Sequence, residues 1–169
     1  ELCVSRQDTP AASMCAIEYY EDSLLPLARL YNLERELDQA LQEKIWLKSG
    51  GFLVIQQTEA FVAIDVNTGK HSSKKDAEEN YKQINREAAL EIARQLRLRN
   101  LSGMILVDFI NMKNTNDQSE LLQYMGSLVR SDPMQTVVVD VTALGIMEIT
   151  RKKSAKTLAE QLLQLKKGE

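Results

Sequence analysis

The chain has very little cysteine or histidine and no long hydrophobic run, and these absences exclude several classes of protein. No apolar run approaches the roughly 18 residues of a membrane-spanning helix, and the N-terminus shows no signal-peptide pattern. We therefore expect a cytoplasmic protein without a membrane span. Cys3 and Cys15 are the only cysteines, with neither C-x-x-C spacing nor a neighbouring histidine, so a zinc site is not expected.

Motifs of several common enzyme classes are also absent. The one histidine, His71, lies in a polar stretch that is more typical of an exposed side chain than of a general base. A Ser-His-Asp hydrolase is therefore hard to support, and there is no P-loop, dinucleotide fingerprint or Gly-x-Ser-x-Gly elbow. The net charge of −3 and the pI near 5.4 give no general attraction to nucleic acid. Any affinity for a polyanion must come from local basic patches.

The composition is that of one globular domain. A length of 169 residues, with 44% hydrophobic and 27% charged, allows a single proper core. Periodic apolar patterns predict strands at 15–20, 44–47, 52–57, 60–66, 104–110, 136–141 and 146–150, and helices at 21–31, 33–42, 77–96, 118–130 and 154–166. This order predicts one α/β domain over 1–169, a layered mixed β-sheet with flanking helices. We expect Trp46, Tyr19, Tyr20 and Phe61 to be core residues and not base-stacking residues, because they lie in apolar runs.

Two stretches place one aspartate at or near the end of an apolar, β-type run. They are AIDVN, which contains Asp65, and LVDFIN, which contains Asp108. An ionised carboxylate is costly to bury in a sheet without a partner. Mg²⁺ and Mn²⁺ prefer oxygen ligands, and Mg²⁺ typically uses only one or two protein carboxylates. Asp65 and Asp108 at the ends of neighbouring strands would supply that pair, with the amide oxygen of Asn67 as a third ligand.

The same residues also fit a purely structural role. Aspartate and asparagine are good turn formers, so each aspartate could simply begin the turn after its strand. Asp140, in VVVDV, is a similar strand aspartate, which shows that the pattern alone is not decisive. The spacing of these residues leaves a metal site and a pair of turns about equally open.

Basic residues gather in three short segments after or near the predicted strands. They are Lys70, Lys74 and Lys75; Arg97 and Arg99; and Arg151 and Lys152. One interpretation is a phosphate-binding surface around the two aspartates, because Lys and Arg supply most contacts to a nucleic-acid backbone. The other is a solvated face, with cations favourably placed near a helix C-terminus. Taken one at a time, the segments favour the second interpretation.

Four ordered blocks of the sequence resemble the ribonuclease E/G family. They are SGGFLVIQQTEA, which begins at Ser49 and runs on to AIDVNTG; NREAALEIARQLRLRN, which begins at Asn85; VDFINM, which begins at Val107; and LGIMEITRK, which begins at Leu144. Several blocks in a fixed order are far more specific than a single short motif. A weaker resemblance extends upstream through 17–42.

The resemblance implies a metal-dependent endoribonuclease that hydrolyses phosphodiester bonds of single-stranded RNA, in a catalytic subdomain with a deoxyribonuclease I-like fold. By their match to the family motifs, Asp65 and Asp108 are the catalytic, metal-binding aspartates, and Asn67 is the supporting ligand. The implied cofactor is Mg²⁺, with Mn²⁺ as a substitute. The implied partner is single-stranded RNA, and the implied products carry a 5′-phosphate and a 3′-hydroxyl.

The chain also departs from the family pattern. The core signature lies within 48–153, the match over 1–47 is weak, and a C-terminal helix is expected within 154–169. Nothing matches the family's oligonucleotide-binding barrel or its Cys-Pro-x-Cys zinc link between subunits. We therefore expect a fragment or shortened member with weakened RNA affinity, and homo-oligomerisation stays open. Asn111 and Gln56 stand where Asp and Glu are frequent, which lowers the local negative charge. The alternative is a catalytically weak or inactive scaffold that binds RNA or a partner.

Overall fold

The computed structural model describes residues 19–69 and 77–167 of the chain. The chain divides into two units, residues 1–37 and residues 38–169. The described part of the first unit contains the short helix α1 (Leu27–Leu30) and the beginning of α2 (Leu33–Leu41). The strands, the remaining helices and every candidate site residue belong to the second unit.

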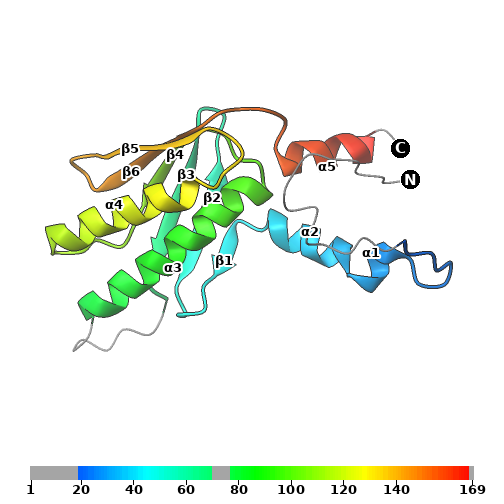
Figure 1. Cartoon of the computed structure of the whole chain (residues 1–169), viewed down its shortest axis with the longest axis horizontal. Coiled ribbons are helices and arrows are strands. Elements are labelled where there is room, and N and C mark those ends of the chain that lie inside the picture. Colours follow the sequence, from blue (N-terminus) through cyan, green and yellow to red (C-terminus); the bar gives the residue numbers. More distant parts are fainter. Residues whose placement is uncertain (1–18, 70–76, 168–169) are drawn as a thin grey trace. The chain divides into compact units, whose positions relative to one another are not determined.

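A six-stranded mixed sheet forms the centre of the second unit (Figure 1). Its strands lie in the order β1-β2-β3-β4-β6-β5. Their bounds are β1 Lys44–Trp46, β2 Phe52–Gln57, β3 Phe61–Asn67, β4 Gly103–Asp108, β5 Thr136–Val141 and β6 Ile146–Arg151. The strands β3 and β4 are parallel, and every other neighbouring pair is antiparallel. The predicted fold class, α/β with a mixed sheet and flanking helices, is confirmed.

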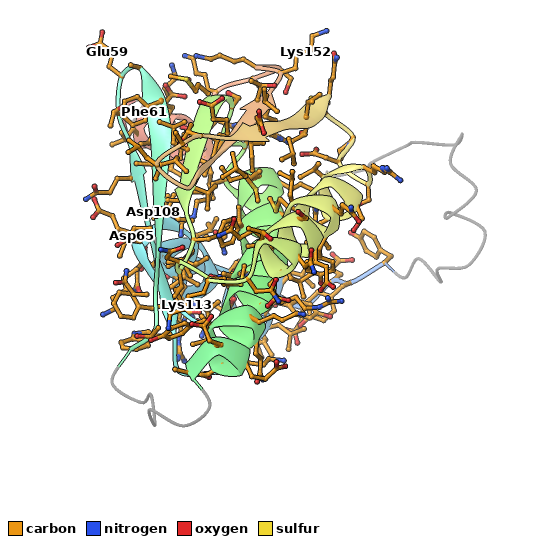
Figure 2. All side chains as sticks on the ribbon, turned by 90° about the vertical axis from the view of Figure 1, so that its left-hand side faces the viewer. Glu59, Phe61, Asp65, Asp108, Lys113 and Lys152 are labelled. Atoms are coloured by element: carbon orange, nitrogen blue, oxygen red, sulfur yellow. The ribbon has the colours of Figure 1, made fainter. Side chains whose placement is uncertain are left out.

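Two helices cover one face of this sheet (Figures 1 and 2). The helix α3 (Ala77–Leu98) connects β3 to the parallel strand β4, a connection that needs a crossover. Its apolar stripe is completely buried at Ile84, Ala88 and Ile92. The helix α4 (Thr115–Val129) packs beside α3, and α5 (Leu158–Lys167) follows β6. Within the described ranges, no helix has both the length and the apolar character needed to cross a membrane.

Residues of each central strand alternate between the two faces of the sheet, because successive side chains of a strand point in opposite directions. In β3, Ile64 is buried in the core with α3, whereas Asp65 is exposed on the opposite face. In β4, Val107 is buried and Asp108 is exposed in the same way. We call the face away from α3 and α4 the open face. Its side chains are half-buried or exposed, so polar groups are tolerated there.

Side-chain caps move two helix ends away from the bounds predicted by apolar periodicity. The helix α4 begins earlier, because the Asn114 side chain accepts a hydrogen bond from the N–H of Asn116 (2.9 Å). The helix α5 begins later, because Thr157 and Glu160 form a capping box. The Thr157 N–H donates to Glu160 Oε2 (2.7 Å), and the Glu160 N–H donates to Thr157 Oγ1 (3.3 Å). The first residues of α4 and α5 are thus set by polar capping groups, which apolar periodicity does not reveal.

The prediction that four aromatic residues lie in the core is wrong for three of them. Trp46 is 65% exposed, because it lies on the edge strand β1 and projects from the open face. Tyr19 is 87% exposed and Tyr20 is 40% exposed, in a segment without helix or strand. Phe61 is half-buried. In the same part of the chain, the helix predicted over 21–31 is reduced to α1, and the strand predicted at 15–20 falls largely outside the described residues.

Candidate active site

Asp65 and Asp108 lie side by side at one end of the parallel strand pair. They are register partners in β3 and β4, so their Cα atoms are separated by one strand spacing, about 4.8 Å. Both are exposed on the open face (Figure 2), and neither belongs to an ion pair among the described residues. Two carboxylates about 4 Å apart repel by about 4 kcal/mol at an effective dielectric constant near 20. A cation between them would remove that repulsion.

Asn67 adds a third oxygen-bearing side chain on the same face. Its Nδ2 donates a hydrogen bond to Asp65 Oδ2 (2.7 Å), which leaves the amide oxygen as an acceptor for another group. The described residues contain no group of three His, Cys, Asp or Glu side chains that could hold a metal ion. Two carboxylates and one amide oxygen nevertheless suit Mg²⁺, which usually keeps several water ligands. The donor set therefore fits a magnesium site.

Asn85 of α3 holds the backbone that follows Asp108. It is completely buried, and its Nδ2 donates to the carbonyl of Ile110 (2.8 Å) while its Oδ1 accepts from the Ile110 N–H (3.0 Å). Because α3 engages both polar backbone groups of Ile110, strand β4 ends at Asp108 and not at 110 as predicted. Sequence reasoning missed Asn85. A polar residue on the apolar stripe of a helix is the signal that could have found it, since a buried amide needs a partner.

The loop between β1 and β2 packs against the end of β3, next to Asn67. Glu87 of α3 accepts hydrogen bonds from the backbone N–H groups of Lys48 and Ser49 and so holds this loop on the helix. Burial by itself would raise the pKa of the Glu87 carboxyl group, but hydrogen bonds from Ser49 and Lys48 outweigh it and hold that pKa below its ordinary value. Glu87 thus stays ionised and keeps the loop in place beside the site.

Replacing Gly69 with alanine is expected to lower the free energy of unfolding by about 1–3 kcal/mol. The new Cβ would collide with the carbonyl oxygen of Gly50, and Gly69 has a φ of +68°, which other residues rarely adopt. Urea unfolding measures the change. Gly126→Ala is the matched control, because a Cβ there meets no atom within 4 Å and alanine favours the helix α4. Equal destabilisation in both variants would contradict the close contact between Gly69 and Gly50.

Arg99 and Arg151 are buried and bind other groups of the protein, so they do not form a phosphate-binding surface. They are only 7% and 4% exposed. Arg99 donates from Nη2 to the carbonyl of Gln42 (2.6 Å) and from Nε to Gln95 Oε1 (2.7 Å). Arg151 forms an ion pair with Asp132, with Nε 2.7 Å from Oδ2. The sequence could not distinguish these two arginines from solvated ones, because Gln42 and Asp132, which bind them, come from other segments of the chain.

The structure does not gather the basic residues of the proposed phosphate-binding surface around the two aspartates. Arg151 is the register partner of Gly103, at the opposite end of β4 from Asp108, and Lys152 follows it (Figure 2). Arg97 is exposed in the last turn of α3. The remaining members, Lys70, Lys74 and Lys75, and with them His71, lie outside the described residues. The described members therefore do not form one surface around the acidic pair.

Lys113 is a basic residue that the sequence did not single out. It lies between β4 and α4, toward the end of the sheet that carries Asp108 and away from Lys152 (Figure 2). Its Nζ is 3.5 Å from Glu78 Oε1, and its side chain is 91% exposed. An exposed pair of this kind contributes little, so Lys113 can exchange this partner for a phosphate.

Three other polar residues of the sequence motifs are not part of the Asp65–Asp108 register pair. Asn111 is exposed and lines a small cavity between the segment after β4 and the β5–β6 turn. Gln56, on β2, has its Nε2 3.5 Å from Glu43 Oε2. Asp140 lies on β5, which β6 separates from β4, and its carboxylate accepts a hydrogen bond from the N–H of the next residue (2.8 Å). The structure thus brings together Asp65, Asn67 and Asp108.

The fold and the site define a layered α/β domain that presents two carboxylates and an amide where its parallel strands end. The sequence matches the ribonuclease E/G family over residues 4–154, and the chain belongs to that family. The resemblance found in the four sequence blocks is therefore confirmed.

The chain matches only part of the length of each individual relative. It is 39% identical over 137 residues to ribonuclease G of Escherichia coli (strain K12), which covers 81% of this chain and 28% of that protein. It is 38% identical over 144 residues to ribonuclease E of Nostoc sp. (strain PCC 7120), which covers 85% of this chain and 21% of that protein. Ribonuclease G of Haemophilus influenzae is 39% identical, with 81% and 28% covered. The chain thus spans 21% to 28% of the length of these relatives.

Proposed function

We propose that this chain carries the catalytic centre of a metal-dependent endoribonuclease that hydrolyses single-stranded RNA. The main support is the register pairing of Asp65 with Asp108 on the open face, with Asn67 bonded to Asp65. The relatives that the chain resembles carry the names ribonuclease G and ribonuclease E. The donor set suits Mg²⁺, with Mn²⁺ as a substitute.

Each residue of the site has a defined task in this proposal. Asp65 and Asp108 supply the negative charge that binds the cation, and the hydrogen bond from Asn67 keeps the Asp65 carboxylate in one orientation. Asp65, Asp108 and Asn67 would hold Mg²⁺, which would supply charge neutralisation at the scissile phosphate and a more acidic water for hydrolysis to a 5′-phosphate and a 3′-hydroxyl. Asn85 fixes the end of β4 that carries Asp108. Lys113 offers a positive charge to the RNA backbone at the same end of the sheet.

Digestion of matched RNA and DNA oligonucleotides, in Mg²⁺, Mn²⁺ or EDTA, tests the proposal. We expect cleavage of the RNA with either metal, no cleavage in EDTA, and products with 5′-phosphates. The chain should be used at high concentration, because it spans only 21% to 28% of the length of its relatives and we expect a high KM. Equal digestion of the DNA would point to a deoxyribonuclease, and cleavage in EDTA would contradict metal dependence.

A non-catalytic scaffold of the same fold is the competing function, and metal binding separates the two. We expect isothermal titration with Mn²⁺ to show one specific site that the Asp65→Asn variant weakens. A scaffold has no need of such a site. If neither metal binding nor RNA cleavage is detected, the scaffold is the better description of this chain.

A further inference from the structure

The open face carries an exposed aromatic cluster beside the candidate metal site. Trp46 of β1 is the register partner of Phe52 of β2, and Phe52 is in turn the register partner of Asn67 of β3. In the neighbouring row, Lys44 is separated from Asp65 by a single strand. Directly opposed residues project to the same side of a sheet. Lys44, Trp46 and Phe52, which we call the aromatic cluster, therefore share a face with the aspartates.

The cluster is ordered by its own contacts. The ring centroids of Trp46 and Phe52 are 5.2 Å apart, with the planes tilted by 57°. Lys44 Nζ lies 3.7 Å from the centroid of Phe52 and 4.3 Å from that of Trp46. These are the distances of an aromatic pair and a cation–π contact. The indole thus has one packed side and a defined orientation before any ligand binds.

Stabilisation of the edge strand explains only part of this arrangement. A cross-strand aromatic pair contributes about 0.5–1.5 kcal/mol beyond the apolar area that it buries. Yet Trp46 remains 65% exposed, so most of the largest apolar side chain of the chain faces water. An exposed tryptophan fixed by its neighbours is a typical binding residue, because it loses little conformational entropy when a ligand covers it.

We propose that the aromatic cluster is a stacking site for a base of the single-stranded RNA whose phosphate lies at Asp65 and Asp108. This inference rests on the proposed function and adds a substrate subsite to it. Unpaired bases stack on aromatic rings regardless of sequence. Lys44, which forms no ion pair among the described residues, supplies a positive charge for the adjoining backbone phosphate.

The distance between the cluster and the aspartates suits this occupant. Lys44 and Asp65 are two strand spacings apart, roughly 10 Å, so one short stretch of single-stranded RNA can contact both. The two places also have complementary chemistry for RNA, since one binds a phosphate through a cation and the other offers a ring and an ammonium group. The substrate is therefore the occupant that uses both features.

The only tryptophan of the chain makes the subsite directly observable. Stopped-flow mixing of the unmodified chain with a single-stranded RNA oligonucleotide in Mg²⁺ is expected to quench Trp46 fluorescence before cleavage. In steady-state cleavage, Trp46→Leu should raise KM by about 5–100-fold, the range that corresponds to stacking of one base, with a much smaller change in kcat. Trp46→Tyr should restore most of the loss. Val137→Ala, at the other edge of the sheet, is the matched control and should not change KM.

The outcomes separate this inference from the proposed function. If the parent chain cleaves RNA and Trp46→Leu cleaves it with the same KM, the stacking site is wrong and the proposed endoribonuclease function still stands. Quenching by RNA in a chain that cleaves nothing supports the stacking site and contradicts the enzyme. Absence of both quenching and cleavage overturns both. If Trp46→Leu abolishes self-association in sedimentation without altering RNA binding, the cluster is a contact between copies and the inference is wrong.

Discussion

Replacing Asp65 or Asp108 with asparagine is expected to reduce RNA cleavage at least about 100-fold. Loss of a group that merely supports a metal ligand already costs about 10–100-fold, and each of these substitutions removes one carboxylate of the Asp65–Asp108 pair. The same variants should bind Mn²⁺ more weakly than the parent chain. Cleavage rates and Mn²⁺ titration measure the two effects separately, so the prediction can be checked even where the parent chain cleaves slowly.

Asp140→Asn is the matched control for these two variants. Asp140 is also an exposed strand aspartate, but its carboxylate accepts a hydrogen bond from the backbone of Val141 and lies on a strand that does not adjoin β4. Its substitution should leave cleavage and Mn²⁺ affinity unchanged. Full activity and full Mn²⁺ affinity in both Asp65→Asn and Asp108→Asn would show that the metal site lies elsewhere.

Replacing Arg151 with methionine is expected to lower the free energy of unfolding by about 3–5 kcal/mol, the cost of leaving one partner of a buried ion pair alone. The side chains of Arg151 and Asp132 are only 3% and 2% exposed. Arg151 also donates from Nη1 to Asn100 Oδ1 (2.9 Å) and to the carbonyl of Leu101 (3.0 Å). It thereby joins the end of β6 to the turns before β4 and β5, so its loss leaves several buried acceptors without a donor.

Lys152→Met provides the comparison, because Lys152 is adjacent in sequence but exposed. Its substitution should change the free energy of unfolding by no more than about 0.5 kcal/mol. Urea unfolding of both variants with the parent chain gives the difference. If Arg151→Met is as stable as Lys152→Met and instead loses RNA affinity, then Arg151 belongs to a phosphate-binding surface, which was one of the two interpretations of the sequence.

The same ion pair predicts how stability depends on acid. Burial by itself would raise the pKa of Asp132, but hydrogen bonds from Arg151 and two further donors hold it below its ordinary value of 3.8. A lowered pKa in the folded state stabilises the protein above the pKa of the unfolded state. That contribution is lost as the pH falls below about 4. The parent chain should lose stability over this range more steeply than Arg151→Met, which pH-dependent thermal unfolding would show.

Sequence patterns predicted most of the strands and helices because the evidence for them is local. The alternation in 52–57 and the long apolar stripe of α3 were recognised correctly from neighbouring residues alone. Errors arose where a partner distant in sequence decides the outcome. The two hydrogen bonds between Asn85 and the backbone of Ile110 end β4 early. The position of Trp46 on an edge strand exposes a side chain that its apolar surroundings assigned to the core.

The sequence by itself determined the fold class, because periodicity is a property of short segments. Its four ordered blocks determined the family, and their match to the family motifs made Asp65, Asn67 and Asp108 the candidate residues. Only the tertiary structure decided that the two aspartates are register partners on one face. It also decided that the side chain of Arg151 is buried and that the side chain of Trp46 is exposed. The physical reason is that strand register, burial and ion pairing are contacts between segments far apart in the chain, and no local pattern encodes them.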